Sequence, residues 1–166
     1  TNFARVYQHD PLGWVNSLGY IEGDKTTAFF SNIFMASSAA PKIRAVSFYT
    51  PVANTAYRVG VYSNVTPGQP RSGTYVRGRM GTVVKPGYTT IGFDAVTVAA
   101  NKPFSVVVKL TTPEYNYPIP IEYAVSGYSS AASSCPGQSY ISHDGVNWTS
   151  TAGGYNVCLK AFGASP

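Results

Sequence analysis

Hydrophobic and polar residues alternate along most of this chain. Eight segments have this period of two and are rich in β-branched and aromatic residues, which is typical of half-buried β-strands. Clusters of Gly, Pro, Asn and Asp separate these segments, and no stretch has the period of an amphipathic helix. We therefore expect strands at 27–36, 43–50, 55–63, 88–93, 104–110, 121–125, 138–142 and 155–162.

Segment 104–110, "FSVVVKL", shows how the alternation predicts burial. Its four hydrophobic side chains at every second position share one face, and Lys109 lies on the opposite face. Short strands that follow one another through Gly- and Pro-rich turns predict an all-β fold, a two-sheet antiparallel sandwich of jelly-roll type. We expect residues 1–166 to form a single domain of this kind within a longer parent protein.

Charged residues are few and unevenly distributed along the chain. Only 11% of the residues are charged, with a net charge of +5, and Tyr, Ser, Thr and Asn replace them, a composition common in extracellular β-domains. Four cations lie close together in the sequence: Arg71, Arg77, Arg79 and Lys85. Gly and Pro surround them, so we interpret this cluster as part of a surface loop and expect no nucleic-acid partner, although an anionic glycan or polymer stays open as a partner.

No run of 18 apolar residues exists, so we expect no membrane span.

The two cysteines, Cys135 and Cys158, are expected to form a disulfide. In segment 155–162 the alternation turns Val157 and Leu159 toward the core, so Cys158 would point outward, within reach of the Ser- and Gly-rich loop that carries Cys135. Such a bond would stabilise the fold by about 3 kcal/mol in an oxidising compartment. Two independent thiols are the alternative.

The segment "SYISHDGVNW", residues 139–148, contains a histidine, an acid and a tryptophan within six positions. Asp144-Gly145 is a strong hairpin signal, because Gly accepts a positive φ and Asp hydrogen-bonds its own backbone. We therefore predict a structural turn here. Direct ligand contact by Trp148 or His143 is the alternative.

The candidates for catalysis and metal binding are few. His9 and His143 are the only histidines, and no Gly-x-Ser-x-Gly motif is present to supply a nucleophile, so we expect no enzymatic activity. Glu22 and Asp24 flank Gly23 and could contribute to a structural calcium site, although no calcium-loop consensus accompanies them. Ordinary loop acids are the favoured interpretation, and no other cofactor is expected.

Several segments resemble a known family in order along the chain. They include "YQHDPLGWVNSLGY", "FMASSAAPKIRAVSFYT", "GYSSAASSCPGQSYIS" and "NVCLKAF". This series, over about residues 5–163, is similar to the lectin-like domain that follows papain-like cysteine peptidase domains in secreted and surface proteins of archaea and bacteria. The resemblance implies a non-catalytic, extracellular or cell-surface β-sandwich beside a peptidase domain. The papain signature around a catalytic cysteine is absent here, so peptidase activity is not implied.

A binding site for carbohydrate or a cell-surface polymer is predicted from aromatic and basic residues outside the expected core positions. Tyr115 and Tyr117 lie two apart in a Pro-stiffened segment and could stack on pyranose rings, or they could simply pack at the edge. Trp14, after the turn at Gly13, is expected to plug the end of the sandwich. The alternative function is a structural domain that packs on a peptidase or in a surface assembly. The predicted ligand-binding residues are Tyr115, Tyr117, Trp148, Arg77 and Arg79.

Overall fold

The computed structural model describes residues 3–39 and 41–164, and over these residues the chain forms β-strands joined by turns. The described part contains no helix long and apolar enough to cross a membrane. The long strands are β3 (Thr27–Met35), β4 (Lys42–Thr50), β5 (Thr55–Ser63), β6 (Thr74–Val83), β7 (Gly87–Thr97) and β8 (Pro103–Thr111). The short strands are β1 (Arg5–Tyr7), β2 (Asn16–Leu18), β9 (Ile119–Glu122), β10 (Ser139–Ser142), β11 (Thr149–Ser150), β12 (Asn156–Val157) and β13 (Leu159–Gly163).

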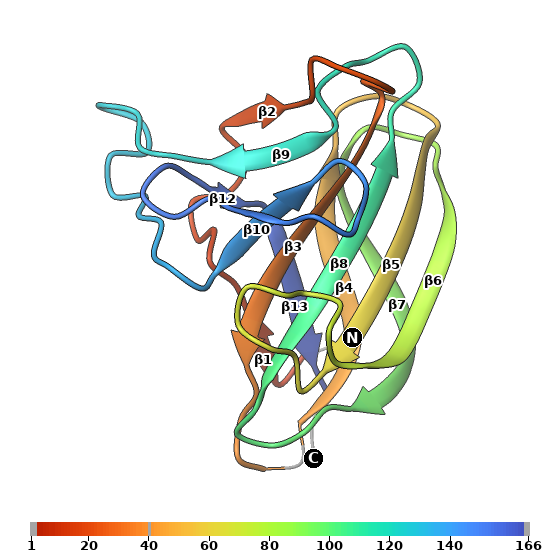
Figure 1. Cartoon of the computed structure of the whole chain (residues 1–166), viewed down its shortest axis with the longest axis vertical. Helices are drawn as coiled ribbons and strands as arrows, with labels where there is room; N and C mark the ends of the chain where they lie inside the picture. The colour runs from red at the N-terminus through yellow and green to blue at the C-terminus, as the bar shows by residue number, and fades with distance from the viewer. Residues whose placement is uncertain (1–2, 40, 165–166) are drawn as a thin grey trace.

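Two antiparallel sheets form the body of the molecule. The six-stranded sheet has the order β11-β10-β3-β8-β5-β6 and faces the viewer in Figure 1, and the four-stranded sheet β1-β13-β4-β7 lies behind it. A small third sheet, β12-β9-β2, covers one end. The chain passes from one sheet to the other between β3 and β4, β4 and β5, β6 and β7, and β7 and β8. This interleaving confirms the predicted all-β sandwich.

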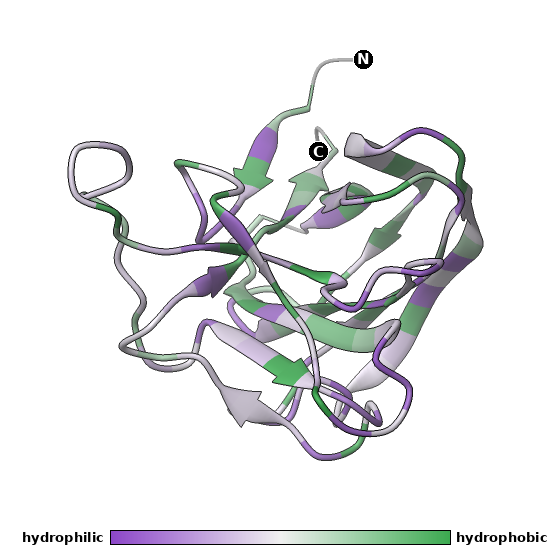
Figure 2. Ribbon diagram, turned by 90° about the horizontal axis from the view of Figure 1, so that it is seen from above, coloured by the Kyte–Doolittle hydropathy of each residue, from purple (hydrophilic) through white to green (hydrophobic). Residues whose placement is uncertain are grey.

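The hydrophobic core lies between the two large sheets, as the alternation predicts. The inner face of β8 contributes Phe104, Val106, Val108 and Leu110, which are all fully buried, while Lys109 is only half-buried on the opposite face. Figure 2 shows the alternation of hydrophobic and hydrophilic residues along the strands. Burying each large apolar side chain stabilises the fold by about 1.5–3 kcal/mol.

The eight expected strands are present, but β7 continues four residues beyond the expected 88–93, and β9 shares only residues 121 and 122 with the expected 121–125. Segment 155–162 is divided at Cys158 into β12 and β13, because the chain there steps from the small third sheet to the four-stranded sheet. Trp14 is not the expected core plug. It is 37% exposed and packs against Tyr49 with 5.7 Å between the ring centroids.

The largest error of the sequence interpretation is β6, which we expected to be a loop. Nine of its ten residues pair with β5, from Thr55↔Val83 to Ser63↔Thr74, and a β-bulge at Val61/Tyr62 leaves out Val76. Arginines and glycines hide its alternation, since an edge strand has only one neighbour and tolerates polar residues on both faces. Arg77 and Arg79 therefore lie in a strand and not in a loop.

The predicted Cys135–Cys158 disulfide is absent, and both cysteines are free thiols. Cys158 points away from the main core, as the alternation requires, but it is only 1% exposed. The N-terminal segment around Asp10 and strand β9 cover that face, and the Cys158 backbone N–H donates to the Pro120 carbonyl at 2.9 Å. Burial raises the pKa of the Cys158 thiol well above its usual range. Cys158 does face outward as predicted, but the predicted disulfide was wrong because a third layer of chain covers this sheet and buries the thiol.

Candidate ligand groove

The segment "SYISHDGVNW" forms a tight turn between β10 and β11, as predicted. Asp144 Oδ1 accepts hydrogen bonds from the backbone N–H groups of Val146 and Asn147, both at 2.8 Å, and from the Ser142 hydroxyl at 3.0 Å. Gly145 supplies the positive φ of 76° that the turn needs. The N–H groups of Asn147 and Val146 hold the pKa of Asp144 far below its usual range. The carboxylate of Asp144 is thus engaged by its own turn.

His143 joins this turn to the loop before β3. Its Nε2 donates to the Asp24 carbonyl at 2.8 Å, and its ring stacks on Tyr20 with 4.6 Å between centroids. A Cβ on Gly23 would lie only 2.9 Å from the His143 ring, so Gly23 allows the close approach. These contacts give His143 a structural role.

We expect Asp144→Ala to lower the melting temperature, because two backbone N–H groups and the Asn147 amide lose their shared acceptor. Asp144→Asn keeps one carbonyl oxygen in place and should lose less. Thermal unfolding followed by circular dichroism measures both variants. Unchanged melting in Asp144→Ala together with loss of ligand binding would contradict the structural interpretation of the turn.

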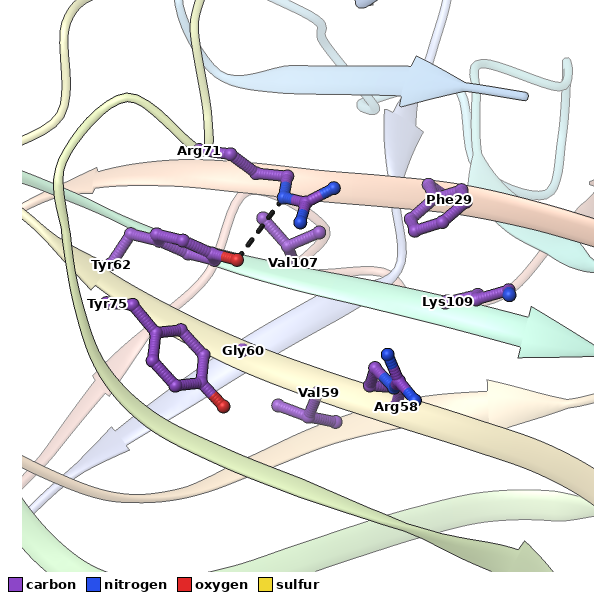
Figure 3. A pocket seen from close by; sticks show the side chains of 9 residues that line it. All are labelled: Phe29, Arg58, Val59, Gly60, Tyr62, Arg71, Tyr75, Val107 and Lys109. Carbon is purple, nitrogen blue, oxygen red and sulfur yellow. Dashed lines mark hydrogen bonds between the residues drawn. The ribbon is translucent and has the colours of Figure 1, made fainter. Parts of the chain in front are cut away.

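A groove crosses the outer face of the six-stranded sheet. It consists of three adjoining hollows with volumes of about 130, 330 and 360 Å³. Arg58 and Lys109 line both the first and the second hollow, and Arg71 lines both the first and the third. The three hollows therefore lie next to one another on this face. The first, shown in Figure 3, is lined by Phe29, Arg58, Val59, Gly60, Tyr62, Arg71, Tyr75, Val107 and Lys109.

A pair of glycines shapes the floor of the groove. Gly60 on β5 lies opposite Gly78 on β6, so neither strand projects a side chain into the groove at that level. A Cβ on Gly78 would collide with the Tyr75 hydroxyl, and a Cβ on Gly60 would lie 3.0 Å from the Tyr62 ring and 3.3 Å from the Tyr75 ring. The two tyrosines, themselves paired across the strands, can therefore lie beside these glycines, with 5.3 Å between their ring centroids and an angle of 61° between the ring planes.

Arg71 is held in place at one wall of the groove. Its Nε donates to the Tyr62 hydroxyl at 3.2 Å, the bond drawn dashed in Figure 3, and its guanidinium also donates to the Gly145 carbonyl at 2.9 Å. The loop that carries Arg71 is tied to β8 by a hydrogen bond from the Ser105 hydroxyl to the Pro70 carbonyl. The turn at Asp144 and the β5–β6 loop together build this wall.

Trp148 is the one predicted ligand-binding residue that lines this groove. Its half-buried ring borders the third hollow beside Arg71, and it packs on Phe29 edge to face at 6.5 Å. The ring also packs against a small buried cluster that includes Ile33 and Tyr140. Trp148 thus packs on buried residues and lines the groove as well.

The other four predicted residues lie elsewhere. Tyr115 and Tyr117 follow β8 and pack on each other edge to face, with centroids 5.6 Å apart and an interplanar angle of 70°, and neither lines the three hollows of the groove. Arg77 and Arg79 lie opposite the core residues Val61 and Val59, on the face of β6 turned away from the groove. The Arg79 guanidinium donates to the Gly92 carbonyl of β7 and so joins the two sheets.

Each of the two histidines forms its side-chain hydrogen bond with a backbone carbonyl and not with a nucleophilic side chain. His9 bonds the Ile33 carbonyl at 2.8 Å, stacks on Phe34, and has its pKa lowered by burial. Asp24, a predicted calcium ligand, accepts hydrogen bonds from the Thr26 N–H and hydroxyl. In the described part of the chain no three His, Cys, Asp or Glu residues group as metal ligands. A structural calcium ion at Glu22 and Asp24 stays a prediction.

Sequence reasoning missed the residues that line the middle of the groove. Arg58, Lys109, Phe29 and Met80 form one cross-strand row, because β3, β8, β5 and β6 are neighbours in that order. The alternation placed Lys109 on the outer face, but it could not show which strands lie side by side.

Comparisons with known proteins agree with this fold. The chain is similar to the clostridial cysteine protease Cwp84 after propeptide cleavage, with a TM-score of 0.79 and 20% identity over 98% of this chain and 40% of that one. It is also similar to the structure of the cysteine protease and lectin-like domains of Cwp84, a surface layer associated protein of Clostridium difficile, with a TM-score of 0.71 and 21% identity over 85% of this chain and 33% of that one.

This chain thus spans two-fifths or less of the length of either structure. At such identities the likeness shows a shared fold. No curated protein matches the chain in sequence. The family model of the lectin-like domain matches residues 6–163, almost the whole sequence. The chain therefore belongs to the lectin-like domain family.

Proposed function

We propose that this domain is a non-catalytic, extracellular binding module that recognises a saccharide in the groove of the six-stranded sheet. One observation carries the proposal. The rings of Tyr62 and Tyr75 lie beside the facing glycines Gly60 and Gly78, with Tyr75 58% exposed. Fixed aromatic surfaces of this kind match the apolar faces of pyranose rings.

The rest of the groove supplies polar groups around these rings. Arg58, Arg71 and Lys109 bring hydrogen-bond donors, and Gln69 and Ser72 add neutral polar groups in the third hollow. A mostly apolar floor with a few polar side chains is the usual composition of a binding site for a small ligand. The long strands hold the floor rigid, which lowers the entropy lost on binding.

The domain is proposed to accompany a cysteine peptidase in a secreted or surface protein. Membership of the lectin-like family and the fold shared with Cwp84, which carries a protease domain and is described as surface-layer associated, support this arrangement. The charge-poor, Tyr- and Ser-rich composition is consistent with an extracellular location. In this arrangement the groove would direct the peptidase toward a glycan-bearing surface.

We expect Tyr75→Ala to weaken saccharide binding roughly five- to thirtyfold, since an exposed aromatic contact contributes about 1–2 kcal/mol. A glycan array on the chain would first identify a ligand, and calorimetry would then compare the variants. Tyr128→Ala is the matched control, because Tyr128 is 76% exposed and lies outside the groove.

Tyr117→Ala distinguishes this groove from the loop site expected from the sequence. Loss of affinity in Tyr117→Ala with none in Tyr75→Ala would move the site to the loop after β8. Repeating the array with calcium and with EDTA tests the predicted calcium ion. An array without any ligand would overturn the saccharide proposal.

A structural role is the second candidate, and an aromatic patch on the other sheet favours it. Trp14, Tyr49 and Tyr88 form a chain of contacts at 5.7 and 5.0 Å between ring centroids, with Tyr88 50% exposed. Exposed aromatic clusters are enriched at protein interfaces. If no saccharide binds, packing of this patch against a neighbouring domain becomes the preferred function.

A further inference from the structure

We infer that the ligand of the groove is an acidic polysaccharide, whose carboxylate or phosphate groups are bound by Arg58, Lys109 and Arg71. This inference rests on the proposed saccharide-binding function and goes further by assigning the charge of the ligand. It is carried by the arrangement of cations on the outer face of the six-stranded sheet (Figure 3).

Arg58 and Lys109 lie directly opposite each other. They are partners in the register of β5 and β8, and both line the first and second hollows of the groove. Like charges that face each other across two strands destabilise a sheet. Lys109 is partly accommodated by the Phe29 ring, whose centroid lies 5.5 Å from Nζ. A bound anion would relieve the repulsion between the two cations.

Acidic side chains do not neutralise these cations within the groove. The residues that line the three hollows include no Asp or Glu. Among residues 3–39 and 41–164, the single ion pair joins Lys160 to Asp10, away from this face. Asp144, next in sequence to the groove-lining Gly145, directs its carboxylate into its own turn. The groove is therefore a positively charged surface.

Arg71 adds a fixed third cation. A guanidinium has five N–H donors, and Arg71 uses one on the Tyr62 hydroxyl and one on the Gly145 carbonyl. The remaining donors are oriented by these two anchors without being consumed by them. Charge-assisted hydrogen bonds to carboxylate or phosphate oxygens are shorter and stronger than bonds to neutral hydroxyl groups.

The shape of the groove favours a polymer over a single sugar. The row from Phe29 to Met80 crosses four adjacent strands, β3, β8, β5 and β6. At the usual spacing of strands this row is about 14 Å long, and Arg71 extends the charged surface into the third hollow. Cations at separate points along the groove match charges that repeat along a chain.

Calorimetry with oligogalacturonate tests the inference, with the methyl-esterified oligosaccharide as the uncharged form of the same sugar. We expect binding of the acid to exceed that of the ester and to weaken as salt is added. Arg58→Gln and Lys109→Gln should each weaken binding about fivefold. Lys42→Gln, an exposed cation on β4 of the other sheet, removes the same charge and should have no effect.

A phosphate-substituted polysaccharide, phosphomannan, distinguishes the source of the charge. Binding of this polymer but not of the uronate assigns phosphate as the recognised group, and the reverse assigns carboxylate. Equal binding of acid and ester, unaffected by Arg58→Gln and Lys109→Gln, overturns the inference while keeping the saccharide site. Equal losses in Lys42→Gln and Arg58→Gln indicate non-specific attraction and also overturn it. Absence of binding to every saccharide, neutral or acidic, overturns the proposed function itself.

Discussion

Lys160→Met should reduce the free energy of unfolding by about 3–5 kcal/mol, because it leaves a buried carboxylate without its counter-ion. Lys160 Nζ donates to Asp10 Oδ2 and to the Asp10 carbonyl, both at 2.8 Å. The side chain of Asp10 is fully buried, and that of Lys160 is 14% exposed. Chemical denaturation at neutral pH measures the loss.

The loss should depend on pH in a defined direction. Burial outweighs the attraction of Lys160 and raises the pKa of Asp10 from its ordinary 3.8 to about 6. As pH falls through about 6, the folded protein therefore takes up a proton that the unfolded chain takes up only near pH 4, so this group makes stability rise on acidification. Without Lys160 the pKa of Asp10 rises further. The penalty of Lys160→Met should accordingly be largest at neutral pH and shrink toward pH 5.

Two variants make this test specific. Lys85→Met removes an exposed lysine and should change stability by less than about 0.5 kcal/mol. Asp10→Asn combined with Lys160→Met removes both charges and should recover part of the loss. A loss in Lys160→Met no larger than that in Lys85→Met would show that the buried pair has no special role.

Asn32→Leu should also be strongly destabilising, by about 2–5 kcal/mol, since several buried polar groups lose their partner at once. Asn32 lies on the inner face of β3, between the core residues Phe30 and Phe34, and it is fully buried. Its amide donates to the Leu159 carbonyl at 2.8 Å and the Val157 carbonyl at 3.3 Å. These two carbonyls flank the step between β12 and β13.

The carbonyl of the Asn32 side chain completes the arrangement by accepting from the Ser139 hydroxyl. Leu has a similar volume, so the variant mainly removes hydrogen bonds and leaves packing nearly intact. Gln8→Leu, at an exposed position, is the control for exchanging an amide for Leu. Urea denaturation of the three proteins gives the comparison. Equal stability of Asn32→Leu and the unchanged protein would mean that these carbonyls find other partners.

The local hydrophobic pattern was sufficient to predict the positions of the strands in which the alternation is regular. β3, β5 and β8 begin and end within about one residue of the expected positions, because every second residue of each packs into the main core. The turn at Asp144-Gly145 was equally predictable, since its hydrogen bonds join residues at most three positions apart. The hydrogen bonds of Asn32 do not follow from such local patterns, because the carbonyls that accept them, at residues 157 and 159, lie more than a hundred residues away along the chain.

The tertiary structure determines which residues form the groove and whether the cysteines can pair. Tyr62, Tyr75, Lys109 and Phe29 come from four strands, and only the pairing order of the sheet brings them to one face. Cys158 lies on the outer side of its strand, as the sequence alone predicted, but the small third sheet and the segment around Asp10 cover it. The sequence determined which side of each strand is apolar, because burial follows a local period of two. The neighbours of each strand were not predictable, because strand pairing joins residues that are distant along the chain.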